Sequence, residues 1–323
     1  MIANSGEYRK KNGQRGYVIM NNFIFENKTK VYFGKGGVKE YLGGLLANFG
    51  ETVMLAYGGG SIKCNGVYDE IMGILNAQGK CVVEFSGIMS NPTYAKVQEG
   101  AKLARENHVD LILAAGGGSV SDCCKVISGA FDTLSHAMET YFGKPDENNL
   151  SDDINEAVMR SVIRNIRILL TDPENYDARS ELAQASAMAE NGVLKIGKVT
   201  DFQAHQIEHQ LGAYTNCNHG AGLAVIHPVL YRHIYKSGTA RFTRWAQNVW
   251  GIAPKGSDEE TAAAGIDALA AFIKEIGLPT SFAELGIPAD TDFRAVADST
   301  NITAGCCKKL THDEIYEILQ ECL

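Results

Sequence analysis

Two identical tetrapeptides constrain the fold of this chain more than any other feature. Residues 58–61 and 116–119 both read Gly-Gly-Gly-Ser, and each follows a short apolar run and precedes a helical pattern. The two runs, 52–57 and 110–115, have the length and the composition of buried strands. A strand that passes through glycines into a helix is typical of βαβ units, so the sequence predicts a parallel sheet covered by helices.

The pattern changes near residue 131. Strand-like runs, which precede this point, nearly vanish after it, and apolar residues then recur every three to four positions, as in amphipathic helices. We therefore predict an α/β, Rossmann-like domain with a parallel sheet at 20–130 and an all-α domain at 131–323. Residues 1–19 are polar and lack the apolar middle of a signal peptide. They are predicted to be a disordered extension, with Met20 as an alternative start.

Charge and cysteine content exclude several classes of protein. The formal net charge of -8 argues against nucleic acid or an anionic membrane as partner. No apolar run approaches the roughly 18–20 residues that span a bilayer. The eight cysteines show no Cys-x-x-Cys spacing, and the adjacent pairs Cys123-Cys124 and Cys306-Cys307 suit disulfides poorly. Reduced thiols indicate a cytoplasmic protein.

The glycine turns also predict a ligand. A turn that opens a helix directs free backbone N–H groups and the helix dipole at an anion, usually a phosphate. Two such turns at the carboxyl ends of two strands lie where parallel sheets bind dinucleotides. No Asp or Glu stands directly after the first strand, whereas Ser61 and Lys63 offer donors and a positive charge. This favours NADP(H), with NAD(H) as the alternative.

Asp132, His136, His205, His209 and His219 form a candidate metal site. Asp132 and His136 are four residues apart, as are His205 and His209, so on helices each pair shares a face. One carboxylate and three imidazoles suit Fe²⁺ or Zn²⁺. Because His205 and His209 share a face, either could be the ligand. We assign Asp132, His136, His205 and His219 as ligands and keep His209 as a proton relay or a wall of the nicotinamide pocket.

These motifs resemble those of the iron-containing (group III) alcohol dehydrogenases, in particular their NADP(H)-dependent, butanol dehydrogenase-like branch. The matching stretches are YGGGSIKCNG (57–66), SNP (90–92), GGGSVSDCCK (116–125), FDTLSHAMETYF (131–142) and HQIEHQLGAYTNCNHGAGLAVIHP (205–228). The likeness runs from about Met20 nearly to the end. It implies a dehydroquinate synthase-like architecture, a homodimer, and the interconversion of a primary alcohol and an aldehyde.

The resemblance also implies roles for single residues. It gives the same four metal ligands, Asp132, His136, His205 and His219, and places His209 close to the nicotinamide as the catalytic histidine. The dinucleotide residues that it implies are Gly58, Gly59, Gly60, Ser61, Asn91, Gly117, Gly118, Ser119 and Asp122.

The chain departs from the family pattern at one place. In the family, several strands and helices, with a Thr-x-x-Gly-Thr-Gly-Ser-Glu-like motif, separate the second glycine turn and its helix from the Asp-x3-His pair. Here only residues 126–131 lie between Lys125 and Asp132, and that motif is absent from the sequence. We infer an internal deletion near 126–131. Two alternatives to the alcohol dehydrogenase hypothesis follow: a truncated, catalytically impaired metal-binding relative, and a polyol dehydrogenase of the same fold.

Overall fold

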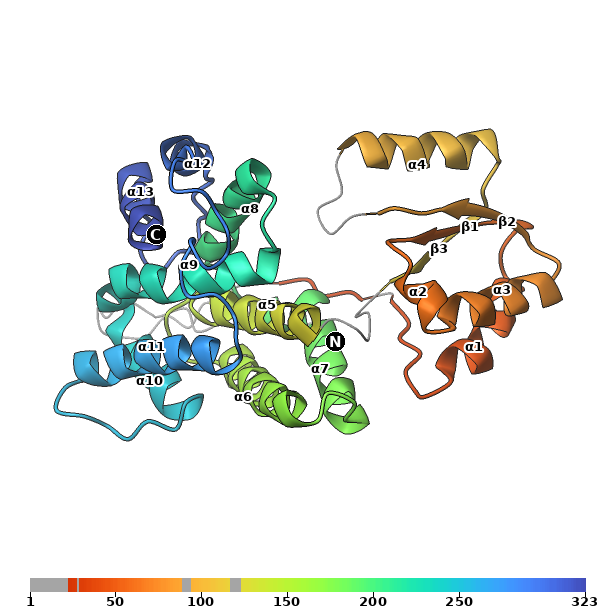
Figure 1. The fold of residues 1–323 in the computed structure, drawn as a ribbon. Coiled ribbons are helices and arrows are strands. Elements are labelled where there is room, and N and C mark those ends of the chain that lie inside the picture. The colour runs from red at the N-terminus through yellow and green to blue at the C-terminus, as the bar shows by residue number, and fades with distance from the viewer. Residues whose placement is uncertain (1–22, 28, 89–93, 117–122) are drawn as a thin grey trace. The chain divides into compact units, whose positions relative to one another are not determined.

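The computed structural model describes residues 23–27, 29–88, 94–116 and 123–323. The chain divides into two compact units (Figure 1). One unit comprises Lys28–Lys125, and the other comprises Val126–Leu323 together with Met1–Asn27. The predicted disordered extension at 1–19 lies outside the described residues.

The unit Lys28–Lys125 contains a parallel sheet whose three described strands have the order β2-β1-β3. These strands are β1 (Thr52–Tyr57), β2 (Cys81–Phe85) and β3 (Leu111–Ala115). Helices lie on both faces: α4 (Tyr94–Glu106) on one, and α1 (Gly37–Leu46), α2 (Ser61–Cys64) and α3 (Val67–Ala77) on the other (Figure 1). The central strand β1 is buried from Val53 to Tyr57 because both of its faces are covered. The predicted α/β fold of this region is confirmed.

The strand order places Gly58 and Gly116, the first residues of the two glycine stretches, at one edge of the sheet. In the register of β1 and β3, Tyr57 stands opposite Ala115, and the strands are parallel. Gly58 and Gly116 therefore leave the sheet at the same edge. The chain runs from β1 to β2 on one side and reaches β3 on the other, so this edge is a topological switch point, where open parallel sheets bind ligands.

Residues 30–33 do not form the strand that an apolar run at this position predicts. Val31 is 72% exposed and Phe33 is 58% exposed, and neither lies in regular structure. A strand needs a neighbour to take its backbone hydrogen bonds. Within the described residues, no strand pairs with this run.

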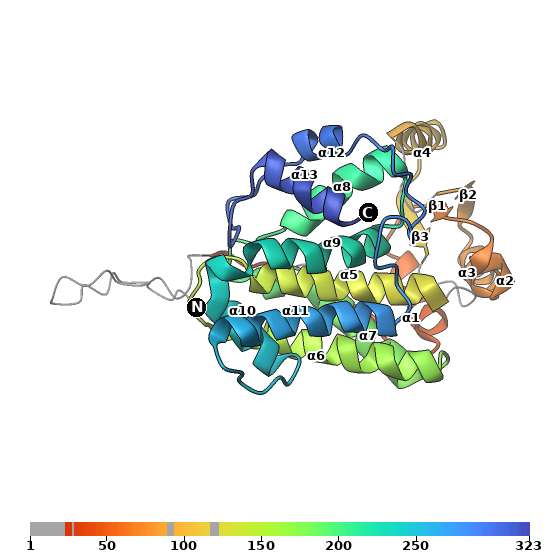
Figure 2. The same ribbon diagram turned by 60° about the vertical axis from the view of Figure 1, so that its left-hand side comes forward.

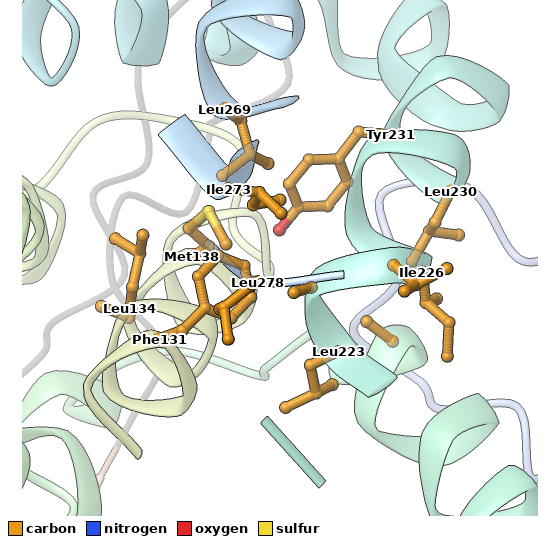
Figure 3. Close-up of a cluster of buried hydrophobic side chains, with 14 of the residues drawn as sticks. Phe131, Leu134, Met138, Leu223, Ile226, Leu230, Tyr231, Leu269, Ile273 and Leu278 are labelled. Atoms are coloured by element: carbon orange, nitrogen blue, oxygen red, sulfur yellow. The ribbon is translucent and has the colours of Figure 1, made fainter. Parts of the chain in front are cut away.

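The unit that begins at Val126 is helical. Its core is built where α5 (Cys123–Tyr141), α9 (His219–Ile234) and α11 (Asp258–Glu275) pack together (Figures 2 and 3). From α5, Phe131, Leu134 and Met138 enter this core, since spacings of three and four residues place them on one face. The remaining helices are α6 (Leu150–Thr171), α7 (Tyr176–Glu190), α8 (Gln203–Thr215), α10 (Thr239–Asn248), α12 (Phe293–Ser299) and α13 (His312–Glu321). None of the described helices combines the length and the apolarity that a membrane crossing requires.

Helix starts follow the capping chemistry, with one difference from the sequence prediction. The sequence predicts Ser151 as the cap of one helix and a Thr311–Glu314 capping box at the start of another. Thr311 and Glu314 do form the capping box of α13. For α6 the cap is Asn149 instead of Ser151: the Asn149 side chain accepts a hydrogen bond from the Asp152 N–H, and Asp152 accepts one from the Asn149 N–H. Ser151 instead donates its hydroxyl to the carbonyl of Ile196, 2.6 Å away. Because its hydroxyl makes this long-range hydrogen bond, Ser151 does not cap α6.

A buried ionic cluster holds α6, α10 and the segment before α8 together. The Asp152 carboxylate is fully buried and accepts hydrogen bonds from Lys198 Nζ at 2.6 Å and from Arg241 Nη1 at 2.9 Å. Both cations also donate to the carbonyl of Tyr141. The charges of two buried cations are thus balanced by one carboxylate in a region that water does not reach.

This cluster predicts a pH dependence of stability. Burial, followed by the nearby charge of Arg241, lowers the pKa of Lys198 from 10.5 to about 8. Between these two values the unfolded chain binds more protons at Lys198 than the folded protein does, so the free energy of unfolding rises with pH. The gain is up to about 1.4 kcal/mol per pH unit. Urea unfolding at pH 8 and pH 9.5 should show a larger increase in the native protein than in Lys198→Met; equal increases in both would contradict the prediction.

Candidate metal centre

Three helices carry the predicted ligands; Asp132, His205 and His219 converge, whereas His136 belongs to a second set of possible ligands with Asp132 and Glu190. Asp132 and His136 lie one turn apart on α5, on a different face from the core residues of that helix. His205 lies in the first turn of α8, and His219 is the first residue of α9. A Cβ atom at Gly220 would stand 2.1 Å from the Ser128 carbonyl oxygen, so glycine is required for α9 to start this close to α5.

One oxygen of Asp132 is the centre of the arrangement. Its Oδ1 lies 3.3 Å from His205 Nε2, 3.4 Å from His219 Nε2 and 3.6 Å from His136 Nε2. Asp132, His205 and His219 each offer one ligand atom, and these atoms all lie within 4.8 Å of one another. We call these three residues the central group.

The central group fits a cation. Asp132 Oδ1 and His205 Nε2 are both buried, and within the described residues neither has a hydrogen-bond partner. Buried polar atoms without partners are costly, and a bound ion is one of the few ways to satisfy both at once. Imidazole nitrogens and a carboxylate oxygen are the donors that Zn²⁺ and Fe²⁺ accept.

Two buried glutamates, Glu139 and Glu208, contact the ligating histidines at Nδ1, the ring nitrogen that faces away from the central group. The Glu139 carboxylate contacts His205 Nδ1, and the Glu208 carboxylate contacts His219 Nδ1. Each carboxylate keeps the proton on Nδ1 and leaves the Nε2 lone pair directed at the central group. Neither glutamate was among the residues predicted from the sequence. Glu139 lies three residues after His136 and Glu208 three after His205, so helical spacing places each beside a predicted ligand, although the histidine that it contacts lies on another helix.

The charges of these groups follow from their contacts. Burial disfavours the charged form of Asp132, but His205 and His219 outweigh burial and lower its pKa. Burial likewise opposes the charge on His205, yet the Glu139 and Asp132 carboxylates raise its pKa to about 9. For His219, Asp132 and Glu208 overcome burial and raise the pKa to about 10. The carboxylates around His205 and His219 thus stabilise positive charge, which a bound cation would supply in place of a ring proton.

Replacing Glu208 by Gln should weaken metal binding. The amide oxygen accepts a weaker hydrogen bond from the Nδ1–H of His219 than a carboxylate does. His219 is then held less firmly in orientation and is a less basic ligand. We expect the affinity for Zn²⁺ to fall about 10- to 100-fold, as measured by competition with a chromogenic chelator. Glu321→Gln is the matched control, because Glu321 pairs with His233, 3.2 Å away, outside the centre. Equal affinities in Glu208→Gln and native protein would contradict the supporting role.

His136 and His209 are placed differently from the central group. His136 Nε2 approaches Asp132 Oδ1 but lies closer, at 2.9 Å, to Glu190 Oε1. Burial and the charge of His205 lower the pKa of His136 to about 4. His209 is exposed and stacks on His219, with ring centroids 5.3 Å apart and planes inclined by 24°. Burial of part of its ring and the charges of His205 and His219 lower the pKa of His209.

The predicted cofactor residues are only partly described. Gly59 and Gly60 are exposed, a Cβ atom built on either would meet open space, and α2 starts at Ser61 as the sequence predicts. Asn91, Gly117, Gly118, Ser119 and Asp122 lie outside the described residues.

A carboxylate that the sequence analysis did not consider stands beside the first glycine turn. Glu84, near the end of β2, accepts hydrogen bonds from the hydroxyls of Tyr57 and Tyr68. Its Oε2 also lies 3.7 Å from Lys63 Nζ. The positive charge of Lys63 is therefore partly balanced.

Comparison with known proteins identifies the family. Residues 28–157 match the profile of iron-containing alcohol dehydrogenase, and residues 126–323 match the Fe-containing alcohol dehydrogenase family, C-terminal. The chain belongs to the iron-containing alcohol dehydrogenase family. The resemblance seen in the motifs is thus confirmed. The central group and its two glutamates lie within the region that the C-terminal profile matches.

Relatives in this family cover nearly the whole chain. The NADH-dependent butanol dehydrogenase A of Clostridium acetobutylicum is 28% identical over 94% of this chain and 100% of its own length. The NADPH-dependent aldehyde reductase of Escherichia coli is 27% identical over 83% of this chain and 90% of its own. The crystal structure of NADH-dependent butanol dehydrogenase A from Thermotoga maritima superimposes with a TM-score of 0.85, at 27% identity, over 94% of this chain and 99% of that one. The predicted architecture is confirmed.

The same comparison reveals a difference in length. The alignment with the Clostridium acetobutylicum member spans 389 positions, whereas this chain has 323 residues, a difference of 66. Because the whole of that relative is aligned, at least that many of its residues have no counterpart here. The iron-containing alcohol dehydrogenase fold in this chain is therefore shorter than in this relative.

Proposed function

We propose that this protein interconverts a primary alcohol and an aldehyde with a nicotinamide dinucleotide, at a metal centre formed by Asp132, His136, His205 and His219. The observation that carries the proposal is the convergence of Asp132 Oδ1 and the Nε2 atoms of His205 and His219 on one point, with two of these atoms buried and without partners. Membership of the iron-containing alcohol dehydrogenase family supports the reaction class.

Each residue has a distinct task in this proposal. Asp132, His205 and His219 would hold Fe²⁺ or Zn²⁺, which when bound supplies Lewis acidity toward the substrate oxygen. Glu139 and Glu208 keep His205 and His219 in the tautomer that leaves Nε2 free. His209 is exposed beside His219 and carries the proton that the substrate oxygen gains or loses.

The proposed cofactor is NADP(H), with NAD(H) as the alternative. Gly58, Gly59, Gly60 and Ser61 would receive one end of the dinucleotide at the switch point of the sheet, and the cofactor when bound supplies the hydride chemistry. Asn91, Gly117, Gly118, Ser119 and Asp122 complete the proposed site. Lys63 favours the 2′-phosphate of NADP(H), while Glu84 beside it favours a free ribose hydroxyl. Relatives whose names specify NADH and relatives whose names specify NADPH both occur.

The test is turnover by the metal-loaded protein. Butanal is added with NADPH or NADH, and loss of cofactor absorbance is followed. His209→Ala should lower kcat by about 10²- to 10⁴-fold, the range of a general acid–base residue, and leave the metal content unchanged. His233→Ala is the control, since His233 pairs with Glu321 away from the centre. An unchanged kcat in His209→Ala would contradict the proton role.

Calorimetric titration with NADPH and NADH separates the alternatives. A functional dehydrogenase binds at least one of them. Absence of binding to either would identify a truncated metal-binding relative, whereas turnover of a polyol in preference to butanol would indicate a polyol dehydrogenase.

We further propose a cytoplasmic homodimer that binds neither nucleic acid nor membranes. The formal net charge of -8 supports the lack of such partners. Cys64, Cys81, Cys306, Cys307 and Cys322 are free thiols, which supports a reducing compartment. Light scattering of the purified protein measures the mass of the assembly.

A further inference from the structure

Phe202 has a backbone conformation that large side chains rarely adopt. Its φ of 54° and ψ of 23° lie in the left-handed region, where the Cβ atom crowds the following carbonyl oxygen. In the described part of the chain, the other non-glycine residues with a positive φ are His108 and Asn216, both of types that tolerate this region. For a bulky residue such as Phe202 the conformation is strained, and strain of this kind is concentrated at functional sites.

Phe202 also occupies a position that usually carries a polar side chain. It is the N-cap of α8, where Asn, Asp, Ser or Thr would accept a hydrogen bond from the first helical turn, and its side chain makes no such bond. The Glu139 carboxylate accepts these bonds instead, from the N–H groups of Ala204, at 2.6 Å, and of His205, at 3.3 Å. Because another helix provides the cap, position 202 is free to carry a side chain with a different function.

The partly buried ring of Phe202 lies against two of the proposed metal ligands. It stacks on His205, with ring centroids 4.7 Å apart and planes inclined by 29°. It meets His136 closer to edge-on, with centroids 5.2 Å apart and planes inclined by 68°. The Lys195 ammonium lies 4.7 Å from the centroid of the ring, within the range of a cation–π contact. Contacts with three residues therefore hold the ring in place.

The stack restrains a motion of His205 that its hydrogen bond leaves free. Glu139 contacts His205 at Nδ1, which holds the imidazole at one atom and allows it to tilt about that contact. An aromatic ring that lies along the face of the imidazole opposes this tilt. His205 Nε2 is then kept 3.3 Å from Asp132 Oδ1, where both atoms can bind one cation.

We propose that Phe202 is a positioning residue of the metal centre, whose ring holds the imidazole of His205 in the orientation that binds the ion. This inference rests on the proposed metal centre. It also gives the strained backbone a reason, because the positive φ sets the direction in which Cβ leaves the chain and hence where the ring lies.

The test compares three variants of the full-length, metal-depleted protein. Phe202→Leu keeps an apolar side chain but removes the aromatic face, Phe202→Asn suits both the left-handed backbone and the N-cap, and Phe202→Tyr keeps the ring. Affinity for Zn²⁺ is measured by competition with a chromogenic chelator. We expect it to fall by about tenfold in Phe202→Leu and Phe202→Asn, the lower end of the loss for outer-shell partners, and to be retained in Phe202→Tyr.

Co²⁺ absorption separates positioning from a general effect on stability. The visible bands of bound Co²⁺ depend on the arrangement of its ligands. At saturating Co²⁺ the bands should therefore shift in Phe202→Leu and Phe202→Asn and stay in place in Phe202→Tyr. A residue that only stabilised the fold would leave the spectrum of the saturated protein unchanged.

Tyr176→Leu is the matched control, because Tyr176 is an aromatic residue, 48% exposed, at the start of another helix, α7. If the native protein binds one equivalent of Co²⁺ and Phe202→Leu gives the same spectrum and Zn²⁺ affinity, the inference about Phe202 is overturned while the metal centre stands. Native-like binding by Phe202→Asn, or an equal loss in Tyr176→Leu, also overturns it. If the native protein binds neither Zn²⁺ nor Co²⁺, the centre itself is refuted.

Discussion

Replacing Asp132 by Ala is expected to abolish metal binding and turnover. Asp132 Oδ1 lies within 3.3 to 3.6 Å of the Nε2 atoms of all three proposed imidazole ligands. Its removal leaves His205 and His219 with no shared anion on the metal side. We expect the affinity for Zn²⁺ or Fe²⁺ to fall by more than about 100-fold, beyond the 10- to 100-fold loss typical of an outer-shell partner.

The measurement is metal content by mass spectrometry after dialysis against a weak chelator, with circular dichroism to verify that the helices remain. Asp146→Ala is the control, since Asp146 is 64% exposed and forms a surface pair with Lys144. The central group is wrong if the folded Asp132→Ala protein keeps one tightly bound ion. If Asp132→Ala loses both the ion and its helicity, the same measurement is made on Asp132→Asn, which preserves the shape of the side chain.

Replacing Asp152 by Asn should destabilise the helical unit by about 3–5 kcal/mol, the cost of removing one partner from a buried ion pair. The side chains of Asp152 and Lys198 are fully buried, and that of Arg241 is 5% exposed. The amide keeps the shape of the carboxylate but leaves the charges of Lys198 and Arg241 uncompensated. Urea unfolding followed by tryptophan fluorescence reports on this unit, because Trp245 and Trp250 both lie within it.

The neighbouring residue provides the control for this prediction. Asp153 also pairs with an arginine, Arg244, but its side chain is 63% exposed. Exposed ion pairs contribute about 0–1 kcal/mol, so Asp153→Asn should change the stability little. Similar losses in the two variants would show that burial does not set the strength of the Asp152 cluster.

The local sequence pattern was sufficient to predict most of the secondary structure. Strand β1 has the predicted bounds and β3 differs from them by one residue, because an apolar run that ends at a glycine turn leaves little freedom in where a strand stops. The Thr311–Glu314 capping box fixes the start of α13 for a similarly local reason. The prediction at residues 30–33 was wrong because a strand exists only if another strand pairs with it, and pairing is not encoded in the run itself.

The ligand types of the metal centre were likewise predictable, whereas their surroundings were only partly so. The four-residue spacing of Asp132 and His136 places both on one face of α5, and the two later histidines follow in recognisable motifs. Glu139 and Glu208 each follow a predicted ligand by three residues, so their place beside the site could have been predicted. Glu190 could not, because it comes from α7 and reaches His136 only through the packing of that helix.

By itself, the sequence determined which segments become strands and helices and which side chains can donate to a metal, since these depend on neighbours within a few residues. The tertiary structure alone decided that Gly58 and Gly116 leave one edge of the sheet, that Asp152 holds two buried cations, and that Glu190 stands on the metal side of His136. These relations join residues from separate elements, and only the packing of those elements sets the distances between them.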